Sequence, residues 1–228
     1  MSPKNSLLIL VFWILGIETL SAQDAALPAL DFSAFQKPFY EKMISKFLQE
    51  PIGNAVALVV FLGMVFIILN ILVRFFGRNS AEFKKWPDWT VPVFALAGLG
   101  VAGYLSILNL TPVDPVCGPV GNCGAVQQSP YAHLFGIIHV SYLGFAAYLV
   151  ILLAALVQRF GAESQKQRAA LITWGMALIG TLFSAYLTFL EPFVIGMTCI
   201  WCVTSAILIS LILRGSSPQA KHAWKSFH

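Results

Sequence analysis

Five apolar runs, each close to 20 residues long, constrain the fold of this chain more than any other feature. They cover residues 55–73, 91–110, 137–157, 171–190 and 194–213, and none contains Asp, Glu, Lys or Arg. An apolar helix of about 20 residues is long enough to cross a bilayer. Backbone groups in lipid must be hydrogen-bonded within their own segment, so each run is expected to be a helix. The sequence therefore predicts an all-α, multi-pass membrane protein embedded in a lipid bilayer.

The composition excludes a soluble globular protein. Hydrophobic residues make up 58% of the chain and charged residues only 11%, whereas a soluble domain carries about 25% charged residues. The net charge of +4 comes from basic residues in the segments between the apolar runs. Nothing in the sequence indicates a nucleic-acid partner.

The first 22 residues have the pattern of a secretory signal peptide. Lys4 precedes an apolar stretch, Leu7–Ile17, which is too short to span a membrane and is followed by small residues. We expect a signal peptide at residues 1–22, with an uncleaved membrane anchor as the alternative. In residues 23–54, apolar side chains recur every three or four positions, which predicts an exported amphipathic helix on the outer membrane surface.

Lys and Arg predict the orientation of the chain, because cytoplasmic loops of membrane proteins are enriched in them. Basic residues follow the first and third runs and occupy the C-terminal tail, whereas residues 111–136 and 191–193 contain none. We therefore expect a cytoplasmic linker at 76–90 and a cytoplasmic tail at 214–228. Residues 23–54, 111–136 and 191–193 are expected on the exported face.

Four cysteines are predicted to lie at that exported face, in two close pairs. Cys117 and Cys123 belong to a loop rich in Pro and Gly, and Cys199 and Cys202 form a CxxC motif at the start of the last apolar run. Disulfides persist in an oxidising compartment, so two disulfides are the simplest arrangement, although four cysteines allow three pairings. Residues Ala125–Phe135 are expected to form a short helix on the membrane surface.

The CxxC motif is well placed for redox chemistry. We expect Thr198 to cap the last helix, with Cys199 at its first position, where backbone N–H groups and the helix dipole lower the pKa of the thiol. Cys202 lies one turn deeper and closer to lipid. A dithiol releases two electrons and a quinone accepts two, so the pattern favours electron transfer from a water-soluble thiol to a membrane quinone. A zinc or copper site and purely structural disulfides remain alternatives.

Two stretches carry a resemblance to a known family. The sequence "CGPVGNCGAVQQSPYAHLFGI", followed by "SAYLTFLEPFVIGMTCIWCVTSAILI", resembles the bacterial branch of the vitamin K epoxide reductase family. The resemblance implies that residues 91–213 form a four-helix transmembrane bundle around a quinone, with a cysteine-bearing outer loop and a short cap helix. Residues 55–75 are then one additional N-terminal transmembrane helix.

The resemblance also implies catalytic roles for the four cysteines. Cys202 is expected to react with the quinone, and Cys199 to pair with Cys202 and to exchange with Cys123. Cys117, in a disulfide with Cys123, is expected to face the thiol partner. The implied function is that of a quinone-dependent thiol:disulfide oxidoreductase, which reoxidises an exported thioredoxin-like protein and supports disulfide bond formation.

Three further residues are candidates for the quinone site. Ser129 occupies the position of a hydroxyl residue on the family's cap helix, and Trp201 and Phe135 are candidates to contact the quinone ring together with Cys202. A surface serine and an interfacial tryptophan are the simpler interpretations. His133 and His139 are interpreted as polar residues of the headgroup region, and Glu191–Pro192 as the helix end between two spans.

The expected cofactor is ubiquinone or menaquinone, and the expected partner is a separate exported thioredoxin-like (DsbA-like) protein, because about 15 residues follow the last run. The animal enzymes carry a tyrosine where this chain has Ser205 and Ala206, which favours a respiratory quinone over vitamin K epoxide. Epoxide or quinone reduction by thiols, and a non-catalytic metal-binding protein, are the alternatives. The expected location is the bacterial inner membrane.

Overall fold

The computed structural model describes residues 32–76, 85–111, 113, 115–118, 121–134 and 136–226. The chain divides into two compact units, residues 1–39 and 40–228. Only the beginning of helix α2 (Phe32–Phe47) is described in the first unit, so the predicted signal peptide lies outside the described residues. The second unit contains all four cysteines.

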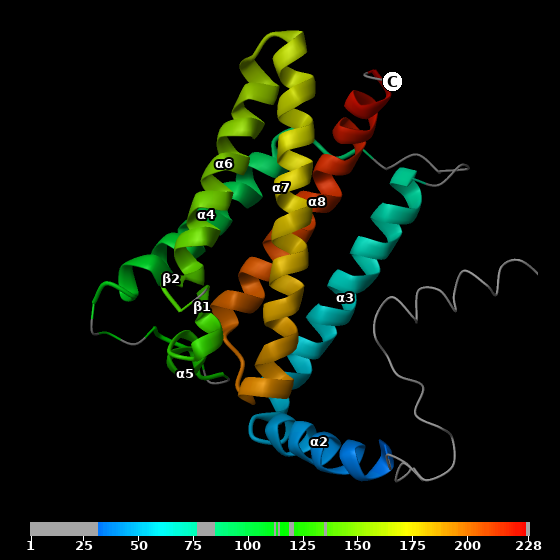
Figure 1. Ribbon diagram of the computed structural model, residues 1–228. Coiled ribbons are helices and arrows are strands. Elements are labelled where there is room, and N and C mark those ends of the chain that lie inside the picture. The colour runs from blue at the N-terminus through cyan, green and yellow to red at the C-terminus, as the bar shows by residue number, and fades with distance from the viewer. Residues whose placement is uncertain are drawn as a thin grey trace, which may run out of the picture. The chain divides into compact units, whose positions relative to one another are not determined.

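Five long helices dominate the second unit, as predicted (Figure 1). They are α3 (Pro51–Phe76), α4 (Thr90–Leu108), α6 (Val140–Phe160), α7 (Glu163–Leu190) and α8 (Ile200–Ser226). Each is long and apolar enough to cross a membrane. The expectation of an all-α integral membrane protein is confirmed.

Several helices extend beyond the apolar runs that predict them. α7 begins at Glu163 instead of residue 171, and α8 continues to Ser226 instead of ending near residue 213. Apolar runs stop at the first charged residues, whereas helical hydrogen bonding continues through them. The extension of α8 is also held by a long-range contact, because Lys221 Nζ donates to the carbonyl of Arg74, 2.9 Å away. Most of the predicted tail at 214–228 is therefore helical.

Small residues allow the helices of the bundle to approach closely. α4 packs against α6 and α8, and α7 packs against both of these helices. The buried face of α4 includes Ala95, Gly98 and Ala102, spaced by three and four residues. Lipid provides no hydrophobic drive for helix association, so close packing across small side chains contributes much of the stability. The ring of Tyr148 from α6 lies directly against Gly98.

α3, the predicted additional helix, packs on this bundle along α7 and α8. Met64 of α3 is buried with Ala185 of α7 and Ala206 of α8. Towards the C-terminal end of α3, Ile68 and Ile71 belong to a larger cluster of buried side chains, to which α4, α6, α7 and α8 also contribute. The helix is thus part of the same packed core.

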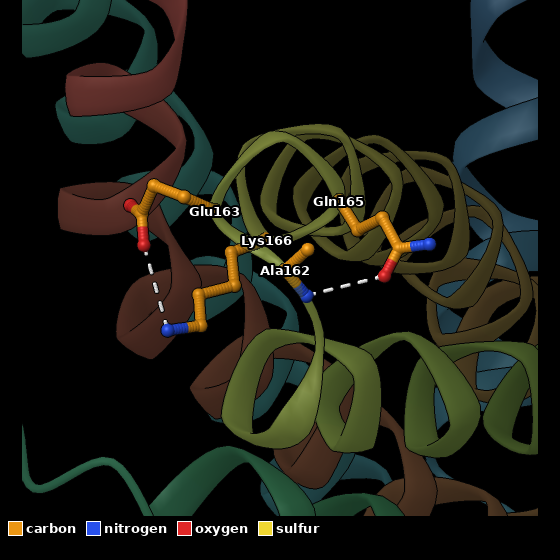
Figure 2. Close-up of polar contacts among 4 residues, drawn as sticks. All are labelled: Ala162, Glu163, Gln165 and Lys166. Atoms are coloured by element: carbon orange, nitrogen blue, oxygen red, sulfur yellow. Dashed lines mark hydrogen bonds and ion pairs between the residues drawn. The ribbon is translucent and has the colours of Figure 1, made fainter.

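The α6–α7 connection is a tight turn with a partial capping box (Figure 2). The Gln165 side-chain oxygen accepts a hydrogen bond from the backbone N–H of Ala162 at 3.2 Å. Ala162 offers no side-chain acceptor in return, so only half of a capping box is formed. Lys166 and Glu163 form an exposed ion pair at 3.4 Å, which contributes little to stability because solvent screens it. The turn places α6 and α7 side by side.

The segment between α4 and α6 forms a cap at the end of the bundle where α7 meets α8 (Figure 1). It contains α5 (Cys123–Gln127), a 3-10 turn (Pro130–Ala132) and an antiparallel pair of short strands, β1 (His133–Leu134) and β2 (Ile138–His139). Gly136, with φ of 72°, lies in the turn between the strands. The prediction of one helix over Ala125–Phe135 is wrong, because Ser129–Pro130 and the strand pair interrupt it.

Candidate functional site

The four cysteines meet in one cluster at this end of the bundle. Cys123 and Cys199 are completely buried there, and Cys117 and Cys202 pack against them. Val126, Ile195, Met197 and Trp201 complete the cluster. The prediction that both pairs lie at the same end of the helices is confirmed, although they come from distant parts of the chain.

The two pairs are in different redox states. Cys117 and Cys123 form a disulfide with a Cα–Cα separation of 5.7 Å, and the Cys123 N–H donates to Cys117 Sγ at 2.8 Å. Cys199 and Cys202 are free thiols. The structure therefore differs from the simplest expectation of two disulfides, and it combines one disulfide with one dithiol. A site binding zinc through all four sulfurs is not formed in this state.

Cys199 caps helix α8 with its own sulfur. The Val203 N–H donates to the Cys199 carbonyl at 3.0 Å, and the Cys202 N–H donates to Cys199 Sγ at 3.4 Å, the position that an N-cap acceptor takes. The prediction that Thr198 caps this helix is wrong, because its hydroxyl donates to Asn54 Oδ1 at 2.9 Å instead.

This position favours a thiolate at Cys199. Hydrogen bonding from Cys202 lowers the pKa of the Cys199 thiol, with smaller help from Gln127, and these contacts outweigh the burial that raises it. The positive end of the helix dipole acts in the same direction. A thiol with a lowered pKa is suited to act as the attacking or leaving sulfur in disulfide exchange.

Gln127, at the end of α5, contacts both thiols of the CxxC motif. Its side-chain amide donates to Cys202 Sγ at 3.4 Å and to Cys199 Sγ at 3.9 Å. Sequence reasoning missed this residue, because a glutamine far from the motif carries no spacing signal. Its N–H groups are placed to stabilise negative charge on both sulfurs.

His139 holds the end of α5 in place. Its Nε2 lies 3.1 Å from the Gln127 carbonyl, so Nε2 carries the proton and Nδ1 is the acceptor. Nδ1 accepts from the Asn109 amide at 2.9 Å and from the Ser141 N–H at 3.2 Å. Burial lowers the pKa of His139, against the Gln127 contact that raises it, and nearby His133 lowers it further. The ring is therefore a neutral link between α4, α5 and α6, and it has a more specific role than a polar headgroup residue.

An apolar cavity of about 470 Å³ opens beside the thiols, between α4, α6, α7, α8 and the cap. Cys202, Gln127 and Ser129 are among its lining residues, together with apolar side chains that include Leu105, Val126, Leu143, Phe183 and Ile209. In the part of the chain that the structure describes, Ser129 Oγ and Gln127 Oε1 are buried without a hydrogen-bond partner. A buried polar atom without a partner is costly, so both are ready to bond a polar group in the cavity.

The other predicted quinone contacts lie differently. Trp201 does not line the cavity; its indole N–H donates to the Val116 carbonyl at 2.9 Å, and its ring lies 4.9 Å from that of Tyr104. Trp201 therefore supports the cysteine loop. Phe135 lies outside the described residues.

Glu191 is a buried carboxyl group next to Cys199. The sequence predicted a helix end at this position, and Glu191 does directly follow the last residue of α7. However, only 2% of its surface is exposed. Its Oε2 accepts from the Cys199 N–H at 3.3 Å, and the residue also lines the cavity. A single π-helical turn at Glu191–Ile195 turns this carboxyl group inward.

Replacing Gln127 with leucine is expected to raise the pKa of the Cys199 thiol, because an amide N–H that stabilises the thiolate is lost. Thiolate absorbance in the ultraviolet, followed against pH, measures this directly, since the disulfide-bonded Cys117 and Cys123 do not titrate. Gln128→Leu, at an exposed neighbouring position, is the matched control and should leave the titration unchanged. Equal curves for both variants would contradict the contact.

Comparison with known proteins agrees with this geometry. Residues 89–214, more than half of the chain, match the model of the vitamin K epoxide reductase family. No match was found among curated proteins or among solved structures. The matched region extends from α4 into the first part of α8, and it includes all four cysteines and the residues that line the cavity. The chain belongs to the vitamin K epoxide reductase family of membrane oxidoreductases.

Proposed function

We propose that this protein oxidises the thiols of a separate exported thioredoxin-like (DsbA-like) protein and passes the two electrons to a membrane quinone, ubiquinone or menaquinone. One observation carries the proposal: Cys202 belongs both to the cysteine cluster and to the wall of the apolar cavity. A sulfur in that position connects a water-soluble thiol reaction to a lipid-soluble acceptor.

The proposed route balances at every step. A partner dithiol reduces the Cys117–Cys123 disulfide, which gives a partner disulfide and two thiols in the loop. Cys123 then attacks Cys199 of an oxidised Cys199–Cys202 pair, which forms a Cys123–Cys199 disulfide and releases the Cys202 thiol. Cys117 attacks Cys123 in turn, which restores the loop disulfide, releases Cys199 and leaves the CxxC dithiol. That dithiol gives two electrons and two protons to the quinone and becomes a disulfide again. The structure's combination of a loop disulfide with free Cys199 and Cys202 corresponds to the state before quinone reduction.

The cavity fits a quinone. Ligand cavities of roughly 300–1,000 Å³ with apolar walls and a few polar groups are typical of small-molecule sites, and this cavity is of that kind. Ser129 is suited to donate a hydrogen bond to a carbonyl oxygen, and Gln127 holds the sulfurs at the same end. A bound quinone supplies a two-electron acceptor; the chain's residues orient it and exclude water.

The sidedness of the site is part of the proposal. Arg74, Arg159 and Lys225 lie in the last turns of α3, α6 and α8, opposite the cysteine cluster along these helices. The positive-inside rule then supports an exported cysteine face in a bacterial inner membrane.

Quinone absorbance tests the function. Purified protein in detergent is mixed with a reduced thioredoxin-like protein and a soluble ubiquinone or menaquinone analogue. We expect one quinone to be reduced for each partner dithiol oxidised, and no reduction when the thiols are blocked beforehand. If quinone absorbance stays constant while the thiols are confirmed to be free, the acceptor is a different molecule, and an epoxide becomes the substrate to test.

A further inference from the structure

Two polar side chains at the start of helix α3 bond the segments that carry the cysteines, although they lie outside the residues that match the family. Glu50 precedes the first residue of α3, and Asn54 lies one turn later. Both bond the segment before α8, and Glu50 also bonds the cysteine loop. Of the six hydrogen bonds described below, five link three segments that are distant in sequence.

Asn54 fastens the segment before Cys199. It is completely buried, and its amide donates to the carbonyls of Phe47 at 2.9 Å and Gly196 at 3.1 Å. Its Oδ1 accepts from the Thr198 hydroxyl at 2.9 Å. Both donors and the acceptor of the amide are thus used, as expected for a buried polar group with a positioning role.

Glu50 joins the two cysteine segments through one carboxylate. One oxygen accepts from the Gly121 N–H, and the other accepts from the Thr198 N–H at 3.2 Å. Gly121 lies two residues before Cys123, and Thr198 directly precedes Cys199. Hydrogen bonds to an ionised acceptor are about twice as strong as neutral ones, so this bridge restrains both segments.

The backbones of these segments also approach each other directly. Asn122 N–H donates to the Thr198 carbonyl at 3.0 Å. Gly121 has φ of 102°, and a Cβ atom there would collide with the same carbonyl. The loop therefore lies against the start of α8 in one register, with Cys123 and Cys199 buried in the same cluster.

We propose that Glu50 and Asn54 are positioning residues for disulfide exchange between Cys123 and Cys199. They bond backbone groups and a hydroxyl rather than the sulfurs, so they act through the geometry of the two segments. Two groups held in reactive geometry behave as if at a very high concentration, and a loop free to move loses much of that advantage. The inference rests on the proposed electron route, and it gives the start of the additional helix α3, with the residue before it, a role in positioning the two exchanging cysteines.

A trapped exchange intermediate measures this positioning. In the full chain, Cys117→Ser and Cys202→Ser leave Cys123 and Cys199 as the only thiols. The fraction joined as a Cys123–Cys199 disulfide, at a series of glutathione redox ratios, gives their effective concentration; a gel shift after thiol labelling reads it out. Adding Glu50→Ala is expected to lower that concentration about tenfold, since two charge-assisted hydrogen bonds are lost. Glu50→Gln retains one acceptor oxygen, so its effective concentration should lie between those of the protein with Glu50 and the Glu50→Ala variant.

A second readout separates positioning from simple damage. The four-cysteine protein carrying Glu50→Ala is fully reduced and mixed with the soluble quinone analogue for a single turnover. That rate should stay within about twofold of wild type, because Glu50 accepts hydrogen bonds from Gly121 and Thr198, and neither of these residues lines the cavity. Glu41→Ala, an exposed carboxylate of α2, is the matched control for both readouts.

The outcomes are distinct. A lower effective concentration with an unchanged quinone rate supports the proposal. An unchanged effective concentration overturns it, and so does an equal fall in both readouts, which would indicate general destabilisation. If wild type itself reduces no quinone, the proposed function fails, while the trapped disulfide still reports on positioning.

Discussion

Replacing Cys202 with serine is expected to lower the rate of quinone reduction by a factor on the order of 10³ or more. Cys202 is the cysteine that lines the cavity, and a serine hydroxyl neither forms a disulfide with Cys199 nor carries electrons. Cys199 can still attack Cys123 of the loop disulfide and release the Cys117 thiol, but no Cys202 thiol is present to cleave the resulting bond from the side of the CxxC motif. We therefore also expect a Cys123–Cys199 disulfide to accumulate, visible by mass spectrometry of peptides from the unreduced protein.

Thr204→Val is the control for damage to α8. Thr204 lies two residues from Cys202, its hydroxyl bonds only the Ile200 carbonyl of its own helix at 2.8 Å, and it does not line the cavity. This variant should reduce quinone at a rate close to wild type. Full quinone turnover by Cys202→Ser would assign the electron transfer to another group and remove the basis of the proposed route.

The spanning helices could be predicted because hydropathy is a property of many neighbouring residues. A segment of about 20 apolar residues has few alternatives to a helix in lipid, because its backbone groups must bond one another there. All five long helices could therefore be predicted from composition. Their ends depend on single contacts that hydropathy does not contain. The bond from Lys221 to the Arg74 carbonyl, which accompanies the extension of α8, is one example. Another is Ser129–Pro130, which ends the helical part of the cap.

The cysteine cluster could be predicted because its members are rare and closely spaced. The groups around the sulfurs could not be predicted. Gln127 bonds Cys199 Sγ across 72 residues of sequence, and Asn54 bonds the Gly196 carbonyl across 142 residues. A polar residue such as Asn54, at the edge of a charge-free run, is a usable signal, since burial there requires partners. Thr198 shows that such a signal can also mislead. Its position in the sequence fits a helix cap, but its hydroxyl donates a hydrogen bond to the buried Asn54 side chain of α3 instead.

The second large effect is expected from Gly98→Ala, which should lower the free energy of unfolding by about 1–3 kcal/mol. A Cβ atom at Gly98 would overlap the Tyr148 ring. That ring is not free to move, because it is 3% exposed and its hydroxyl donates to the Ser205 carbonyl at 2.8 Å. Unfolding in detergent, followed by tryptophan fluorescence, measures the loss.

Gly100→Ala is the matched control on the same helix. A Cβ atom there meets nothing within 4 Å, and alanine is the better helix former by about 1 kcal/mol, so stability should be unchanged or slightly higher. Tyr148→Leu in the Gly98→Ala background should recover part of the loss, because it removes the ring that collides. Since Tyr148 and Ser205 also line the cavity, a displaced ring should raise the KM for quinone more than it lowers kcat. Equal free energies of unfolding for the Gly98→Ala and Gly100→Ala proteins would contradict the close contact between Gly98 of α4 and the Tyr148 ring of α6.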